Sequence, residues 1–104
     1  MTTPEQAEAN LLGTVSIALA ELRGEDFRTR RRGIMMVAAV LGHRIGTEQL
    51  RDQPWGAVGQ CENCGCIGKA PRDGDSLEGR ALTTICPAAR ADLARRCQSD
   101  STAP

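Results

Sequence analysis

The chain has 104 residues, which is room for one small domain but not for two. Its 13 basic and 13 acidic residues balance, so no overall charge attracts the protein to nucleic acid or to a membrane surface. Only 2% of the residues are aromatic, so aliphatic side chains must fill a modest core, and a metal cross-link would add stability that such a core lacks.

The cysteine count and the first residues of the chain indicate the cytoplasm. Five cysteines are an odd number, which does not suit a closed set of disulfides. The apolar stretch at residues 11–20 has the length of a signal-peptide core, but Glu5 and Glu8 precede it where a signal peptide carries Lys or Arg. No apolar run reaches the length of a membrane span. We therefore expect a cytoplasmic protein with reduced thiols and no membrane partner.

The first half of the chain predicts two helices. A threonine cap followed by a proline predicts the start of a helix over about 4–23, and apolar residues recur at helical spacing until Gly24. Asp26 can cap a second helix over about 27–41, which Gly42 would end. Since the connection between the two helices is short, they should pack as an antiparallel hairpin.

The second half has a different composition. Glycine, proline and aspartate become frequent, and short apolar runs alternate with turn signals. These runs predict three short strands, over 56–60, 66–70 and 80–85. Pro87 then suits the first turn of a short helix that would run to residue 97.

Together these elements predict an α+β protein with one domain over residues 1–97. Its N-terminal helical hairpin would cover residues 4–42. Residues 43–97 would form a zinc-ribbon-like part, in which a small antiparallel sheet with a zinc knuckle is followed by a short C-terminal helix. Residues 98–104 have nothing to bury and are expected to be disordered.

The stretch Cys61-Glu62-Asn63-Cys64-Gly65 has the form of a metal-binding knuckle. Two intervening residues allow both thiolates to reach one ion, and the glycine permits the positive φ that such a turn often needs. Inert buried thiols are the alternative, but this spacing is an uncommon way to place core residues. An iron–sulfur cluster would favour a different spacing, and thiol–disulfide chemistry would need a βαβ context that is missing. The sequence therefore predicts half of a structural Zn²⁺ site.

A tetrahedral site needs two further ligands. Cys86 is the first choice for the third, since it precedes Pro87 at the start of a predicted helix, where a thiolate is favoured. The candidates for the fourth are His43, Cys66 and Cys97. In a helix with a rise of about 1.5 Å per residue, Cys97 would lie about 16 Å from Cys86, and Cys66 adjoins the knuckle without completing it readily. We favour His43, the only histidine, because three thiolates lack a partner.

Four short elements follow one another along residues 42–87: Gly42-His43, Cys61-x2-Cys64-Gly65, Gly79-x-Ala81-Leu82 and Cys86. Their succession resembles small uncharacterised bacterial and phage proteins with a zinc-ribbon-like half. The resemblance implies a site of one histidine and three cysteines, on His43, Cys61, Cys64 and Cys86. It implies no activity.

A catalytic role is not expected. A catalytic zinc keeps one coordination position open for water and needs a nearby base. If His43 and three cysteines close the site, no position stays open, and the chain has no second histidine. The sequence also lacks the deaminase signature, which pairs His-x-Glu with Pro-Cys-x-x-Cys. We therefore expect a protein that is not an enzyme.

DNA binding is the main alternative function. Residues 37–51 resemble a helix-turn-helix with a turn at Gly42 and a second helix from about Thr47, although Glu48 stands where that motif has an apolar residue. An arginine-rich patch could contact phosphates. Its candidate residues are Arg28, Arg30, Arg31, Arg32, Arg44 and Arg51.

We favour a small zinc-stabilised adaptor, or interaction module, that binds another protein. In so small a chain, zinc most often holds the fold together. The contact surface would combine the helical hairpin with exposed Met35, Met36 or Trp55. On this interpretation, the four arginines at the start of the second helix (Arg28, Arg30, Arg31 and Arg32) simply form its solvated face.

Overall fold

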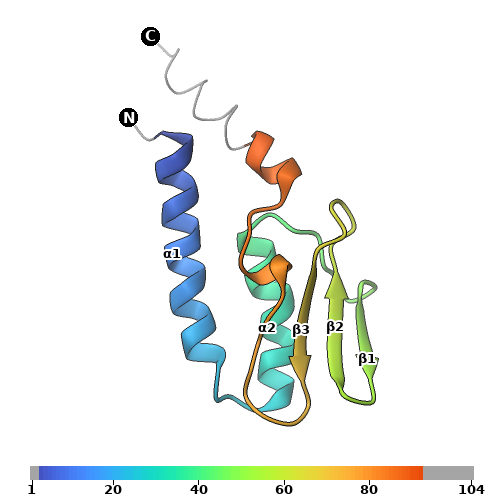
Figure 1. The fold of residues 1–104 in the computed structure, drawn as a ribbon. Coiled ribbons are helices and arrows are strands. Elements are labelled where there is room, and N and C mark those ends of the chain that lie inside the picture. Colours follow the sequence, from blue (N-terminus) through green and yellow to red (C-terminus); the bar gives the residue numbers. More distant parts are fainter. Residues whose placement is uncertain (1–2, 93–104) are drawn as a thin grey trace.

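The structure, a computed structural model, describes residues 3–92 (Figure 1). The α+β class expected from the sequence is confirmed. A last helical segment covers residues 87–92, and its predicted extension to residue 97 and the tail at 98–104 lie outside the described residues. The elements before it are helices α1 (Pro4–Leu22) and α2 (Phe27–Val40), strands β1 (Leu50–Gln53), β2 (Gly56–Gln60) and β3 (Ile67–Pro71), and the 3-10 helix η1 (Arg80–Leu82).

Helices α1 and α2 form the expected antiparallel hairpin (Figure 1). The Thr3 hydroxyl accepts a hydrogen bond from the N–H of Gln6 at 3.1 Å, and the Asp26 carboxylate accepts one from the N–H of Thr29 at 2.8 Å. Such caps satisfy donors that the first turn of a helix leaves free. Between the helices Gly24 adopts a φ of 92°, which a glycine tolerates best. Both helices begin and end within one residue of their predicted bounds.

The three strands form an antiparallel sheet in the order β1-β2-β3, and α2 packs against β2 and β3. Gly59 of β2 pairs with Gly68 of β3, and Ile34 of α2 lies against both. A Cβ atom on either glycine would stand 3.3 Å from Cγ2 of Ile34. The paired glycines therefore let the helix approach the sheet closely.

One apolar core joins the helices, the sheet and the segment that follows it. Its buried side chains come from α2, the sheet, η1 and the segments between them, whereas α1 buries only Val15 and Leu19. The centre of the molecule is thus the layer between α2 and the sheet, and α1 lies outermost (Figure 1). Within residues 3–92, no helix is long and apolar enough to cross a membrane.

The strand predicted over 80–85 is not formed, and η1 stands in its place. Ala81 and Leu82 are neighbours in the sequence and both are buried, which the alternating faces of a strand would not allow on one side of a sheet. The hydroxyls of Thr83 and Thr84 donate to carbonyls one turn earlier, which supports the helical turn. The third strand is β1 instead.

The helix-turn-helix predicted over 37–51 is absent. Its first helix belongs to α2, but residues 47–49 form a turn and β1 follows at once. The N–H of Gly46 donates to the side chain of Gln49 at 2.8 Å across this turn. Leu50 pairs with Gly59 and is buried. The prediction was wrong because Leu50 pairs with β2 across the short β1–β2 turn, and this pairing, rather than helix propensity, decides the conformation here.

Candidate metal centre

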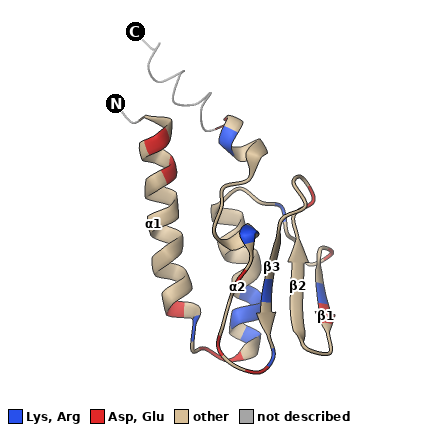
Figure 2. Ribbon diagram, viewed as in Figure 1, with Lys and Arg blue, Asp and Glu red and all other residues tan. Residues whose placement is uncertain are grey.

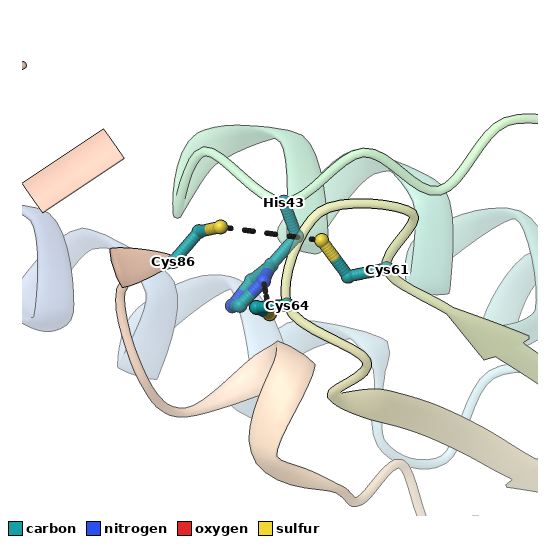
Figure 3. A group of neighbouring side chains, drawn as sticks. All are labelled: His43, Cys61, Cys64 and Cys86. Carbon is teal, nitrogen blue, oxygen red and sulfur yellow. Dashed lines mark hydrogen bonds between the residues drawn. The ribbon is translucent and has the colours of Figure 1, made fainter. Parts of the chain in front are cut away.

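Four side chains from separate segments meet in one cluster (Figure 3). His43 follows the end of α2. Cys61 and Cys64 lie in the turn between β2 and β3, and Cys86 directly precedes the helical segment 87–92. One donor atom from each lies within 4.8 Å of the others. The structure thus brings together the four residues predicted as ligands, and the group could hold a metal ion.

The distances between the donor atoms suit one tetrahedral ion. Cys61 Sγ and Cys86 Sγ are 4.0 Å apart, and Cys64 Sγ is 3.3 Å from Nδ1 of His43. Zinc bonds of about 2.3 Å to sulfur and about 2.0–2.1 Å to nitrogen would place tetrahedral ligand atoms about 3.5–3.8 Å apart. All four cysteines in the described part of the chain are free thiols, so the cluster is not a disulfide.

A backbone carbonyl decides which nitrogen of His43 faces the thiols. Nε2 lies 2.6 Å from the carbonyl oxygen of Thr84. Because a carbonyl oxygen can only accept, Nε2 of the neutral ring donates its proton there and Nδ1 is left unprotonated. Metal-binding histidines commonly donate through the second nitrogen in this way, which orients the ring. Nδ1, which faces Cys64, is therefore the nitrogen that can bind an ion.

Hydrogen bonds favour the thiolate form of Cys61. Burial by itself raises the pKa of this thiol, but hydrogen bonds from three backbone N–H groups lower the pKa. The N–H groups belong to Arg44, Cys64 and Asn63. The N–H of Arg44 lies 3.3 Å from Sγ. Cys61 therefore loses its proton more readily than an ordinary thiol before any metal binds.

Cys64 behaves in the opposite way. Burial raises the pKa of its thiol, and although the N–H of Cys66 lowers it, the neighbouring thiols raise it further, to about 12. Burial disfavours the charged thiolate, and a second negative charge beside Cys61 is unfavourable as well. A bound cation removes this repulsion, because its charge stabilises several thiolates side by side. The chemistry of the cluster therefore fits a cation.

The knuckle has the backbone geometry expected of it. Gly65 adopts a φ of 79°, as its place in the motif predicts. Its N–H donates to the carbonyl oxygen of Cys61 at 2.9 Å, and the N–H of Cys61 donates to that of Cys66 at 2.8 Å. These bonds close the turn between β2 and β3 with both sulfurs held toward His43.

Gly42 holds the end of α2 against the Cys86 segment. It adopts a φ of 78°, and a Cβ atom there would stand 2.1 Å from Cβ of Ala89. The N–H of Cys86 donates to the carbonyl oxygen of Leu41 at 2.9 Å. The sequence identified Gly42 only as a helix end. Its second role, and that of the Thr84 carbonyl, depend on backbone contacts that no residue pattern reveals.

Three of the four candidate ligands are buried. His43 is 5% exposed, Cys61 2% and Cys86 0%, whereas Cys64 is half-buried. Cys66 is also half-buried and is not part of the group of four. Cys97, the remaining alternative for the fourth ligand, lies outside the described residues.

Arg30 cannot be a phosphate contact, contrary to the prediction. Its side chain is 1% exposed and donates to the carbonyl oxygens of Glu25, Pro71 and Ser76 at 2.7–3.1 Å. The guanidinium also lies 5.9 Å from the ring centre of Phe27. Arg30 instead ties the start of α2 to the end of β3, a role that its place among other arginines hides.

The other five candidate arginines are either in ion pairs or exposed. Arg31 pairs with Asp52 at 2.7 Å, and Arg44 pairs with Glu62 at 3.2 Å. The side chains of Arg28, Arg32 and Arg51 are exposed. Arg51 lies on β1, and Arg28 and Arg32 lie on α2, so none of the three lies on the recognition helix that was expected from about Thr47.

Comparison with protein-family models, with curated proteins and with solved structures gives no match for this chain. The resemblance to zinc-ribbon-like proteins therefore stays a prediction. The function has to be argued from the site itself.

Proposed function

We propose that the protein is a small adaptor whose fold is held together by one structural Zn²⁺. The observation that carries this proposal is the meeting of an unprotonated imidazole nitrogen and three thiols within 4.8 Å. Thiolate and imidazole ligands favour Zn²⁺ over hard cations such as Mg²⁺ or Ca²⁺, which prefer oxygen. The ligands would be His43, Cys61, Cys64 and Cys86.

A structural role is favoured over a catalytic one. Four protein ligands fill the tetrahedral positions of Zn²⁺ and leave none for water. The ion would join the end of α2, the β2–β3 turn and the segment after η1, which are remote in the sequence. In a core of small aliphatic side chains, such a cross-link supplies much of the stability.

Exposed apolar side chains support a role in binding protein. Met36 is 60% exposed on α2 and Trp55 46% exposed at the β1–β2 turn. Met35, which was expected to be exposed, is half-buried and packs against the core. Trp55 and Met36 have the large apolar surface that interfaces favour. They lie on different elements, so the chain has two candidate contact surfaces, as a linking protein requires.

DNA binding has less support. Of the six candidate arginines, one is buried and two are paired with carboxylates. The remaining three would have to bind phosphate without a helix to enter the major groove. A weak, nonspecific contact through Arg28 and Arg32 is the form of DNA binding that this surface favours.

One experiment tests both parts of the proposed function. The full chain purified from its native cell should contain one zinc per chain by elemental analysis, and a strong chelator should unfold the ligand-bearing segments reversibly, as followed by hydrogen exchange. The zinc-loaded chain, immobilised, should capture a protein from native lysate, and Trp55→Ala should lose it while Cys66→Ser keeps it. A metal-free folded chain would contradict the zinc. If nuclease treatment abolishes the capture, nucleic acid mediates it, and the adaptor function is contradicted.

A further inference from the structure

The outer face of α1 is uncovered within the part of the chain that the structure describes. Only Val15 and Leu19 of α1 are buried. Yet α1 carries no charged side chain between Glu8 and Glu21. A helix face that stays in water normally carries charged residues, so an uncharged outer face indicates contact with a further surface.

A groove of about 350 Å³ lies between α1 and α2, and we name it the hairpin groove. Val15, Ala18 and Leu22 line it from α1, and Met36, Val37 and Val40 line it from α2. Val40 is 44% exposed. Ile17, which is 65% exposed, lies one turn from the groove residue Glu21 and therefore stands beside the groove. Exposed apolar side chains of both helices thus lie along this groove, whereas Leu12 of α1 lies in a separate pocket beside Leu82.

Acidic and basic residues both lie where the two helices join, at one end of the hairpin groove (Figure 2). Glu21 and Glu25 line it from the α1 side. Arg28 and Arg32 are exposed on the first turns of α2, and Arg32 lies one turn before Met36. Neither Glu21 nor Arg32 forms an ion pair within residues 3–92. The α1 side of the groove is therefore acidic at this end and the start of α2 is basic, whereas Arg23, at the end of α1, lines a separate pocket beside Leu82.

We propose that the partner at the hairpin groove is a second copy of this chain. The two hairpins would form an antiparallel four-helix bundle about a two-fold axis parallel to the helices. In this arrangement α1 of one copy lies beside α2 of the other, and the joined ends of both hairpins stand at the same height. The proposal rests on the function proposed above, since it names the partner for the helical surface of that interaction module.

Charge complementarity selects a second copy over an unrelated protein. The two-fold axis places Glu21 and Glu25 of one copy next to Arg28 and Arg32 of the other, and it does so twice. The same axis places Ile17 of one copy against the apolar groove residues of α2 in the other copy, which include Met36 and Val40. A pattern that is acidic on one helix and basic on the other, at the same height, matches itself. The sheet side with Trp55 stays free for another protein.

Sedimentation equilibrium of the zinc-loaded full chain tests the association. The wild type should have the mass of two chains, and Met36→Glu should have the mass of one. Met36 is 60% exposed, so the fold should tolerate the change, and circular dichroism and zinc content verify this. The matched control is Trp55→Glu, an exposed apolar residue on the sheet side, which should stay dimeric. A monomeric wild type, or a Met36→Glu chain that still dimerises, would overturn the proposal.

A pair of charge-reversed chains tests the arrangement. One chain carries Glu21→Arg and Glu25→Arg, and the other carries Arg28→Glu and Arg32→Glu. Each alone should be monomeric, and an equimolar mixture should form a heterodimer, because only unlike chains then match. Homodimers of either chain, or a mixture that stays monomeric, would contradict the bundle. A monomeric, zinc-loaded wild type that still captures a different protein would overturn this inference and leave the proposed function in place.

Discussion

Nε2 of His43 lies 2.6 Å from the carbonyl oxygen of Thr84, so the only histidine of the chain is tied to the segment that carries Cys86. The N–H of Cys86 in turn donates to the carbonyl oxygen of Leu41, close to His43 in the chain. These two contacts hold a nitrogen and a sulfur donor at a fixed separation. Two ligands of the candidate site are therefore positioned by the backbone, which is how preorganised metal sites gain affinity.

Substitution of the four candidate ligands should remove the metal. His43→Ala should weaken zinc binding by more than about 100-fold, because a ligand is lost and changes even to its hydrogen-bond partners commonly cost 10–100-fold. Cys61→Ser, Cys64→Ser and Cys86→Ser should each lose zinc. Competition against a chromophoric chelator measures the affinities. Cys66→Ser is the matched control and should bind like the wild type, and an empty site in that variant would place Cys66 among the ligands.

Zinc affinity should rise with pH. The Cys64 thiol, whose pKa burial and neighbouring thiols raise to about 12, must lose its proton to bind the ion. Around neutral pH, a fall of one pH unit should therefore weaken zinc binding by at least about tenfold. Backbone N–H groups lower the pKa of Cys61, so its proton joins the competition only at lower pH, where the dependence becomes steeper. Chelator competition in a series of buffers measures this, and an affinity that does not change with pH would show that no thiol proton is displaced.

Gly42→Ala should destabilise the fold by about 1–3 kcal/mol, because the left-handed backbone conformation strains any other residue. The added Cβ would also collide with Ala89 at 2.1 Å. Gly13→Ala is the control, since that glycine lies inside α1 with nothing within 4 Å of a new Cβ. It should stabilise the protein by about 0.5–1 kcal/mol. Urea unfolding of the zinc-loaded chains measures both, and equal stabilities would contradict the close contact at Gly42.

Arg30→Gln should destabilise the protein by about 2–4 kcal/mol, because it leaves buried carbonyl oxygens without a donor. Those carbonyls belong to Glu25, Pro71 and Ser76. Arg51→Gln, at an exposed position on β1, should change stability by less than about 0.5 kcal/mol. The free energies of unfolding in urea make the comparison. Similar small effects for both variants would mean that Arg30 is not buried in solution.

Duplex DNA should not bind tightly at physiological salt, because the chain is neutral overall. Within α1 and α2, only Arg28 and Arg32 are exposed basic residues without an ion pair. A mobility-shift titration over a range of salt concentrations measures this. Should binding occur, its log–log slope would be about −0.9 per phosphate contact, and Arg28→Gln with Arg32→Gln would flatten it. Tight, salt-sensitive binding that this double change abolishes would favour the DNA-binding alternative.

Local residue chemistry alone determined the hairpin and the knuckle. The caps at Thr3 and Asp26 bond to N–H groups only three residues away, and the turn glycine Gly65 needs no remote partner. Spacing within Cys61-x2-Cys64 likewise brings two sulfurs together whatever surrounds them. The helix bounds and half of the metal site were predictable for this reason.

Strand pairing and tertiary contacts decided the rest. Leu50 lies in a strand rather than a helix because it pairs with Gly59 across the β1–β2 turn, and Arg30 is buried because carbonyls remote in the sequence accept from it. His43 faces the thiols because the Thr84 carbonyl holds its ring. The sequence made His43 only one candidate among three, since the position of a fourth ligand depends on how α2 packs against the sheet and the following segment. That packing is a sum of long-range contacts, which no local pattern contains.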